Sequence, residues 1–185
     1  MPRYVAFLRA INVGGHVVKM SALKTLFSGM GFSGVETFIA SGNVLFETKA
    51  KDAALLEKRI GGVLGGALGY EIATFLRTEA EIAALAKYEA FPAAKVAVAR
   101  AHCVGFLAAP LAGVAALAAL KKFETDEDTF HMRGREVFWL CTRRQSDSKF
   151  NNARFEKSLG VRATWRNVRT VSRLAARLGP AGAAR

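Results

Sequence analysis

The chain of 185 residues is long enough to bury one sizeable core or two small ones. Its composition, 51% hydrophobic and 23% charged, is typical of a soluble globular protein. The net charge of +12 is concentrated near the C-terminus: residues 131–185 hold 13 Lys or Arg against 3 Asp or Glu, and residues 1–130 hold 14 against 12. This basic third indicates either a polyanionic partner or a surface on which arginine serves solubility.

The apolar stretches of the chain predict a cytoplasmic protein without a membrane segment. Residues 101–120 carry no Lys, Arg, Asp or Glu, but a proline and a glycine divide them and much of the rest is alanine, which excludes a transmembrane helix. Arg9 interrupts the apolar N-terminus, so no signal peptide is expected. Cys103 and Cys141 lie in strand-like runs without metal-ligand spacing, and both are expected to be reduced core residues.

The first half of the chain alternates between strand-like and helix-like patterns. Leu23, Leu26 and Phe27 follow helical spacing, whereas β-branched and aromatic residues mark the strand-like runs. Ser21 is the expected N-cap of the first helix. Strands are expected at residues 3–11, 35–40, 44–48 and 71–77, and helices at 21–30, 52–64 and 79–88.

Phe91-Pro92 marks a boundary, after which the same order of elements recurs. Strands are expected at residues 101–107, 128–132, 136–141 and 161–165, and helices at 111–120, 149–159 and 168–178. Each half has the order βαββαβ followed by a trailing helix, which is the ferredoxin-like unit. The sequence therefore predicts an α+β fold of two tandem ferredoxin-like domains, residues 1–92 and 93–185. Identity between the halves is negligible, so this duplication is inferred from element order alone.

The order of elements also predicts where a site lies in the first half. A right-handed crossover makes the first two strands run the same way, so the loop after strand one, the turn after strand two and the loop before strand four share one edge. These segments are residues 12–19, 41–43 and 65–69. The residues expected to bind a ligand at this edge are Arg9, Asn12, Gly14, Gly15, Lys19, Ser41 and Asn43.

The chemistry of these residues suits an anion. Glycines allow backbone N–H groups to turn toward a ligand, and the helix start that follows adds a positive dipole end. The alternative is a tight turn that simply needs positive φ. Arg9, near the end of an apolar strand, needs a partner, which is either an anionic ligand or a carboxylate such as Glu36 or Glu47.

The last helix offers a second, different surface. Arginines at four-residue spacing lie on one face of it, opposite an apolar face, and such a stripe is either a solvated face or a phosphate-binding one. The residues expected to contact a nucleic-acid backbone are Arg162, Arg169, Arg173 and Arg177. Arg166 and Asn167, at the helix start, offer donors to a phosphate or carboxylate and are added to the ligand-binding set.

Three motifs resemble the signatures of a known family. They are L-R-A-I-N-V-G-G at residues 8–15, S-G-N-V-L-F at 41–46 and T-W-R-N-V-R-T-V at 164–171. In this order they are similar to the domain of unknown function 1697 family, which is uncharacterised and mostly bacterial. The chain departs from the pattern at Ala10, often glycine there, at Val168, usually tryptophan, and at His16, usually lysine or a polar residue. The resemblance implies the fold and the site positions, and it transfers no activity.

No constellation of residues names a reaction. Ser41 could act as a nucleophile with His16, but no third member of a triad is identified, and the acidic run Asp126–Asp128 is expected to point into solvent. No metal or cofactor is expected, and whether the protein is an enzyme stays open, as does its oligomeric state. We expect a binding protein for a small phosphorylated or carboxylated ligand.

Two alternatives remain beside this expectation. One is a nucleic-acid-binding protein without sequence specificity, because the ferredoxin-like sheet is also the platform of RNA-recognition domains. Against it, the aromatic signature of those domains is missing, and the central strands carry apolar residues on both faces, so an open stacking surface is not expected. The other is an assembly protein without a ligand.

Overall fold

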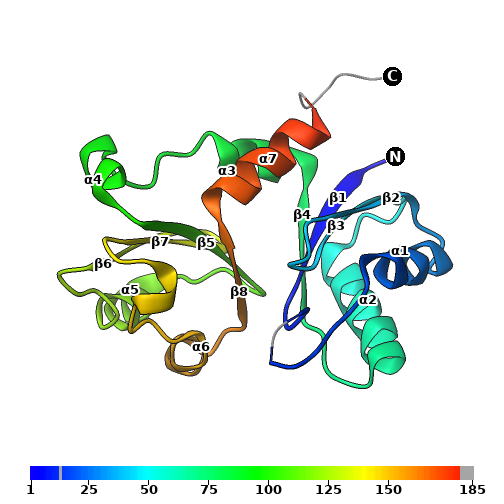
Figure 1. Cartoon of the computed structure of the whole chain (residues 1–185), viewed down its shortest axis with the longest axis horizontal. Helices are drawn as coiled ribbons and strands as arrows, with labels where there is room; N and C mark the ends of the chain where they lie inside the picture. The colour runs from blue at the N-terminus through cyan, green and yellow to red at the C-terminus, as the bar shows by residue number, and fades with distance from the viewer. Residues whose placement is uncertain (13, 180–185) are drawn as a thin grey trace. The chain divides into compact units, whose positions relative to one another are not determined.

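Two four-stranded antiparallel sheets, each with its own helices, make up the computed structural model, which describes residues 1–12 and 14–179 (Figure 1). The first unit consists of Met1–Leu85 together with the chain from Ser172 onward, and the second of Ala86–Val171. Residues 180–185, which the sequence assigned to the second domain, lie outside the described residues.

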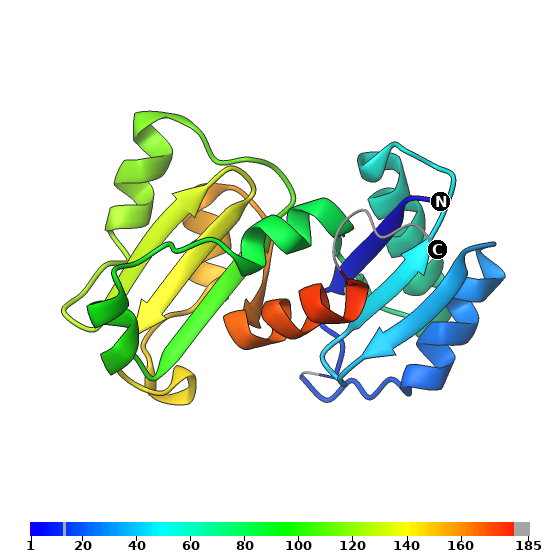
Figure 2. The ribbon, with the colours of Figure 1, turned by 90° about the horizontal axis from the view of Figure 1, so that it is seen from above.

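The first unit has the expected order of elements. Its strands and helices are β1 (Arg3–Leu8), α1 (Met20–Gly29), β2 (Ser33–Phe38), β3 (Asn43–Glu47), α2 (Ala53–Leu68), β4 (Thr74–Thr78) and α3 (Glu79–Ala86). The strand order is β2-β3-β1-β4, with every neighbouring pair antiparallel, and it can be followed in Figure 2. This is the ferredoxin-like arrangement.

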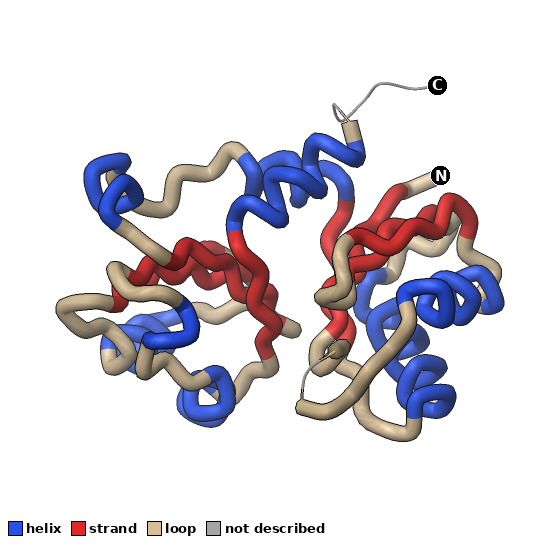
Figure 3. The backbone as a smooth tube through the Cα atoms, in the orientation of Figure 1, coloured by secondary structure: helices blue, strands red, loops and turns tan. Residues whose placement is uncertain are grey.

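The second unit repeats this arrangement. Its elements are α4 (Ala93–Val98), β5 (Ala101–Leu107), α5 (Gly113–Lys121), β6 (Asp128–Arg133), β7 (Glu136–Cys141), the short 3-10 helix η1 (Gln145–Asp147), α6 (Asn152–Leu159) and β8 (Ala163–Asn167). The last helix, α7 (Val168–Leu178), begins in the second unit and belongs to the first from Ser172 onward. The strand order β6-β7-β5-β8 matches that of the first unit position by position. Figure 3 shows the strands and helices of each unit in red and blue. The predicted α+β fold of two ferredoxin-like units is confirmed.

The strand registers align the two halves residue by residue, although their sequences differ. Val5 pairs with Arg77 across β1 and β4, and Val104 pairs with Arg166 across β5 and β8. Around these pairs, V-A-F-L in β1 corresponds to V-G-F-L in β5. A buried arginine therefore occupies the same place in both sheets, immediately before the trailing helix.

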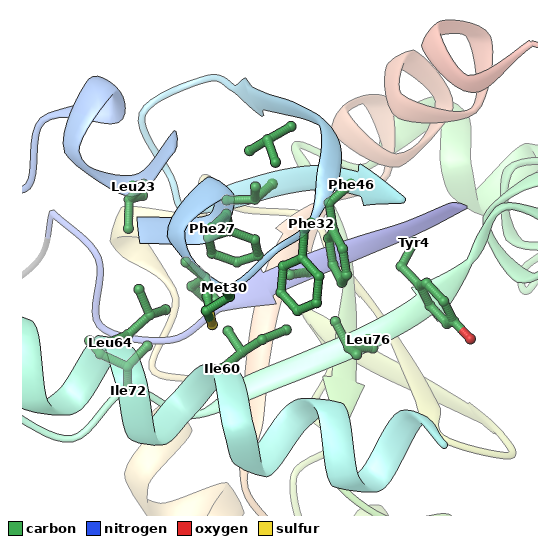
Figure 4. Close-up of a cluster of buried hydrophobic side chains, with 14 of the residues drawn as sticks. Tyr4, Leu23, Phe27, Met30, Phe32, Phe46, Ile60, Leu64, Ile72 and Leu76 are labelled. Carbon is green, nitrogen blue, oxygen red and sulfur yellow. The ribbon is translucent and has the colours of Figure 1, made fainter. Parts of the chain in front are cut away.

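The core of the first unit lies between its sheet and the helices α1 and α2 (Figure 4). The ring centroid of Phe46 lies 4.5 Å from that of Phe32 and 5.5 Å from that of Phe27. Phe27 is fully buried, and Phe32 and Phe46 nearly so. Aromatic rings dominate the apolar area of such a core, so these three fix how α1 lies on β3.

The opposite face of the same sheet is buried as well. Val5, Phe7, Leu45 and Phe75 alternate with the residues of the α1/α2 face and are at most 2% exposed. Their register partners confirm the prediction that the central strands are apolar on both faces. A sheet with two apolar faces needs both of them covered, because exposed apolar area costs about 25 cal/mol per Å².

Part of that cover in the first unit comes from the C-terminal helix. The guanidinium of Arg173 lies 5.0 Å from the ring centre of Phe38, and Arg177 forms an ion pair of 2.7 Å with Glu36. Both partners are on β2, whose register places them on the face opposite α1 and α2. Residues of α7 from Ser172 onward therefore belong with the first unit, whereas the sequence boundary after residue 92 assigned the whole helix to the second.

Several predicted element boundaries are wrong for identifiable reasons. β1 ends at Leu8 because Ala10 and Asn12 take positive φ, 66° and 55°, so Arg9 is not on the strand. The N-cap of α1 is Lys19, not Ser21. Helix α4 lies just after the Phe91-Pro92 boundary, where the sequence predicted no element.

The glycines of α2 do not fray it. The helix continues to Leu68, and its glycines permit a close approach: a Cβ on Gly61 would lie 2.8 Å from the carbonyl oxygen of Ile72. No helix in the described part of the chain is long and apolar enough to cross a membrane.

Gly42 gives a test of the packing at the β2–β3 turn. Its φ is +73°, and a Cβ there would lie 2.8 Å from the Cβ of Ile11. Gly42→Ala is expected to lower the free energy of unfolding of the first unit by about 2–4 kcal/mol, from positive φ and overpacking together. Gly69→Ala, with φ +79° and open space, should cost only about 1 kcal/mol. Equal losses in urea unfolding would mean that the Ile11 contact is unimportant.

Candidate functional site

Three loops of the first unit meet at one edge of its sheet. The N–H of Leu8 donates to the carbonyl of Gly42, and the N–H of Arg9 donates to the carbonyl of Ala73, each at 2.8 Å. The segment before β4 joins the other two here through residues 69–73, slightly later in the chain than the 65–69 expected. We call residues 9–12, 14–19, 39–43 and 69–73 the loop edge.

Asn12 holds two of these segments together. Its Nδ2 donates to the carbonyl of Ala40 at 2.8 Å, and its Oδ1 accepts from the N–H of Val18 at 2.6 Å. With φ at 55°, it is a non-glycine residue in the left-handed region, where asparagine is better tolerated than most. Both the nitrogen and the oxygen of the Asn12 side-chain amide therefore form hydrogen bonds within the loop edge.

Backbone strain is confined to this edge. Across residues 1–12 and 14–179, positive φ outside glycine occurs only at Ala10, Asn12 and Ile39, and all three belong to the loop edge. For the β-branched Ile39, with φ 50° and a side chain 41% exposed, this is a genuine outlier. Such residues cost about 1–3 kcal/mol each and tend to cluster at functional sites.

The β2–β3 turn uses its polar residues internally. Asn43 is fully buried, and its Nδ2 donates to the carbonyl of Phe38 and to Oγ of Ser41, both at 2.9 Å. Asn43 therefore shapes the turn and does not face solvent. His16 stacks on Tyr70 with ring centroids 3.7 Å apart. The structure thus gives Ser41 and His16 different partners, which weakens their interpretation as a catalytic pair.

The exposed part of the edge carries charges of both signs, from Lys19 and from Glu71. Gly14 and Gly15, with φ of 62° and 86°, lead to Lys19, which is exposed and precedes α1. Among the residues that the structure describes, no side chain caps the N-terminus of α1, and no acidic residue lies in its first turn. Arg9 is half-buried. The carboxylates expected to pair with it, Glu36 and Glu47, form ion pairs with Arg177 and Arg3.

A groove that the sequence analysis missed adjoins the loop edge. It has a volume of about 800 Å³ and lies between α2 and the segment that leads into β4. The hydroxyl of Tyr70 and Oγ1 of Thr74 are both buried without a hydrogen-bond partner, and both residues line the groove. Burial raises the pKa of Tyr70 above its usual value. The paired glycines at 61–62 and 65–66 were the available signal, since they leave one side of α2 bare.

Arg166 and Asn167 belong to the second unit, whereas the loop edge is made entirely of first-unit residues. Nη1 of Arg166 donates to Oγ1 of Thr164 at 2.9 Å and to the carbonyl of Trp165 at 2.8 Å. The side chain is 8% exposed, and this burial lowers its pKa to about 10. Asn167 accepts from the N–H of Arg169 at 2.9 Å, as expected of an N-cap.

Arg77 is the counterpart of Arg166 in the first unit, and sequence analysis did not single it out. It is fully buried on β4, and its Nη1 donates to the carbonyl of Leu76 at 2.7 Å. A comparison of the two halves could have found it, because L-R-T precedes α3 in the same way as W-R-N precedes α7. Two of the four arginines expected to contact nucleic acid, Arg173 and Arg177, are exposed and lie beside Phe38 and Glu36.

The acidic run before β6 does not point into solvent throughout. Asp128 is 5% exposed, and its Oδ1 accepts from Nε1 of Trp139 at 2.8 Å, which corrects the expectation from the sequence. Glu127 forms an ion pair with Arg143. Within the described residues, no group of three or more His, Cys, Asp or Glu side chains could hold a metal ion.

Comparison with known proteins now adds the family. The family described as "Protein of unknown function (DUF1697)" matches residues 1–138. The chain belongs to this family. A conserved bacterial protein, SP0830 from Streptococcus pneumoniae, has a similar structure, with a TM-score of 0.73 at 22% identity over 96% of this chain and 98% of that one. This likeness shows a shared fold. The search of curated proteins found no match.

The role of Asn12 can be tested by stability. Asn12→Ala loses both hydrogen bonds and strains the left-handed backbone, so the free energy of unfolding should fall by about 2–3 kcal/mol. Asn12→Gly loses the same bonds without the strain and should cost about 1 kcal/mol less. Urea unfolding of the two variants measures this difference. If glycine proved no better than alanine, the positive φ of 55° would not carry a cost.

The two cysteines are free and buried, so they are expected to be unreactive. Burial raises the pKa of the Cys103 thiol to about 12, with a smaller contribution from Cys141, and burial also raises the pKa of Cys141. Because only the thiolate is nucleophilic, iodoacetamide at pH 8 should alkylate the native chain at least about a hundredfold more slowly than the urea-unfolded chain. Comparable rates would show that the second unit opens readily.

Proposed function

We propose that this protein binds a small anionic ligand, phosphorylated or carboxylated, at the loop edge of the first unit. The observation that carries this proposal is the uncapped N-terminus of α1, which follows Lys19 and a loop with positive φ at Gly14 and Gly15. Free N–H groups and the positive end of the helix dipole attract an anion. The exposed cation at the same point adds to this attraction.

Strain at the loop edge supports a binding role over a purely structural turn. A turn that only reverses the chain can use glycine at every positive-φ position, yet Ala10 and Ile39 occupy two of them here. The hydrogen bonds that join the three loops hold these residues in place. A rigid, pre-organised loop loses less entropy when a ligand binds, which is the usual gain from such strain.

A small ligand fits the fold better than a nucleic acid does. Both faces of the first sheet are buried, so this sheet offers bases no open stacking surface. The guanidinium groups of Arg173 and Arg177 lie against Phe38 and Glu36. Ser41 and His16 have other partners, so the proposal is binding, with no reaction assigned.

Thermal unfolding with and without anions tests this proposal. Inorganic phosphate and a nucleoside monophosphate are the small probes, and a single-stranded oligonucleotide is the alternative. A small anion at a hundredfold excess over its Kd should stabilise the chain by about 2.7 kcal/mol. Lys19→Gln should weaken its binding about tenfold, as expected for one charge-assisted hydrogen bond.

The matched control is Lys24→Gln, which removes an exposed charge from the same helix beyond its first turn. It should leave the affinity for the small anion unchanged. Equal losses in both variants would indicate non-specific charge attraction and contradict a site at the helix start. Stabilisation by the oligonucleotide alone, strongly weakened by salt, would favour the nucleic-acid alternative.

A further inference from the structure

His102 of the second unit carries a buried nitrogen without a partner. The residue lies on β5, on the sheet face that its register shares with Phe138 and Leu140. Its Nε2 is inaccessible to solvent and makes no hydrogen bond with any of residues 1–12 and 14–179. On the same face, Nε2 of His131 is paired with the hydroxyl of Tyr88 at 2.7 Å. A buried polar atom without a partner costs about 1–3 kcal/mol, so it calls for an explanation.

His102 lines an apolar cavity of about 360 Å³. Phe91 and Tyr88 give the cavity aromatic walls, and Val96 with three alanines adds further apolar lining. Glu89, an exposed residue, is the one carboxylate among the lining residues. The ring of Phe91 meets that of His102 edge-on, with centroids 5.8 Å apart. The volume is at the lower end of the range for small-molecule pockets, and the lining suits a flat apolar group.

A second cavity, of about 340 Å³, shares His102 and Val96 with the first. Its lining is different in charge, because Arg100 and Arg169 both contribute to it, together with Asn167. Both arginines are exposed residues, and no carboxylate lines this cavity. Guanidinium groups at this position suit a carboxylate, to which arginine can donate two hydrogen bonds.

We propose that the second unit binds a small aromatic carboxylate across these two cavities. The ring lies in the cavity walled by Tyr88 and Phe91, the carboxylate faces Arg100 and Arg169, and His102 Nε2 hydrogen-bonds the ligand between them. This site is separate from the loop edge, because all its residues belong to Ala86–Val171. It therefore does not depend on the proposed function of the first unit.

The charge state of the histidine agrees with this geometry. Burial lowers the pKa of His102 below its usual value, so the imidazole is neutral at pH 7. A neutral imidazole presents one donor and one acceptor and does not bring a second buried charge beside the apolar cavity. The two arginines then carry the electrostatic attraction for the carboxylate.

The experiment uses the full chain and benzoate as the probe, with binding measured by calorimetric titration. Benzyl alcohol tests the ring without the charge, and inorganic phosphate tests the charge without the ring. Benzoate is expected to bind at least about tenfold more tightly than either. His102→Phe removes the nitrogen and keeps an aromatic ring, and Arg169→Gln removes one cation; each should weaken benzoate binding about tenfold.

The control variant is Arg144→Gln, which removes an exposed arginine of the same unit that does not line either cavity. It should leave benzoate affinity unchanged. If His102→Phe fails to fold, the comparison of Arg169→Gln with Arg144→Gln still tests whether benzoate binds at these cavities. Absence of benzoate binding, equal binding of benzyl alcohol, or equal losses in Arg169→Gln and Arg144→Gln would each overturn the proposal.

Discussion

The fold depends on one constraint, which is that the sheet of the first unit is apolar on both faces. Helices α1 and α2 cover one face, where Phe27, Phe32 and Phe46 pack. The other face requires cover that a single βαββαβ unit does not supply. The C-terminal helix answers this need in part, because Arg173 and Arg177 lie against β2 on that face. The last residues of the chain thereby become part of its first unit.

Each unit also carries one buried arginine on its last strand. Arg77 and Arg166 occupy equivalent positions on β4 and β8, each just before the helix that trails its unit. Burying a guanidinium is costly unless its N–H groups are satisfied, and each donates to a neighbouring backbone carbonyl. Their shared position shows that the duplication extends to a detail of side-chain chemistry, although sequence identity between the halves is negligible.

The loop edge combines strained backbone conformations with hydrogen bonds between its segments. Ala10, Asn12 and Ile39 have backbone conformations with positive φ. Asn12 donates a hydrogen bond to the carbonyl of Ala40 and accepts one from the N–H of Val18, and these bonds hold the loop segments together. The nearby groove between α2 and the entry to β4 is lined by the glycines of α2, and at Gly61 the carbonyl of Ile72 approaches the helix closely. The architecture therefore leaves a concave, partly polar surface next to an exposed cationic helix start.

The sequence by itself determined the order of elements, and with it both ferredoxin-like sheets and the meeting of three loops at one edge. Periodicity and chain handedness suffice for this, because they act locally or through short connections. The motifs at residues 8–15 and 41–46 lie within residues 1–138, which match the family.

Only the tertiary structure decided the rest. Asn43 is buried, and Glu36 and Glu47 form ion pairs with Arg177 and Arg3. These contacts depend on which elements, distant in the sequence, become neighbours in the fold. The tertiary structure also left His102 Nε2 without a partner while His131 found Tyr88. Composition and spacing cannot distinguish those two histidines, because satisfaction of a buried polar atom depends on packing across the whole unit.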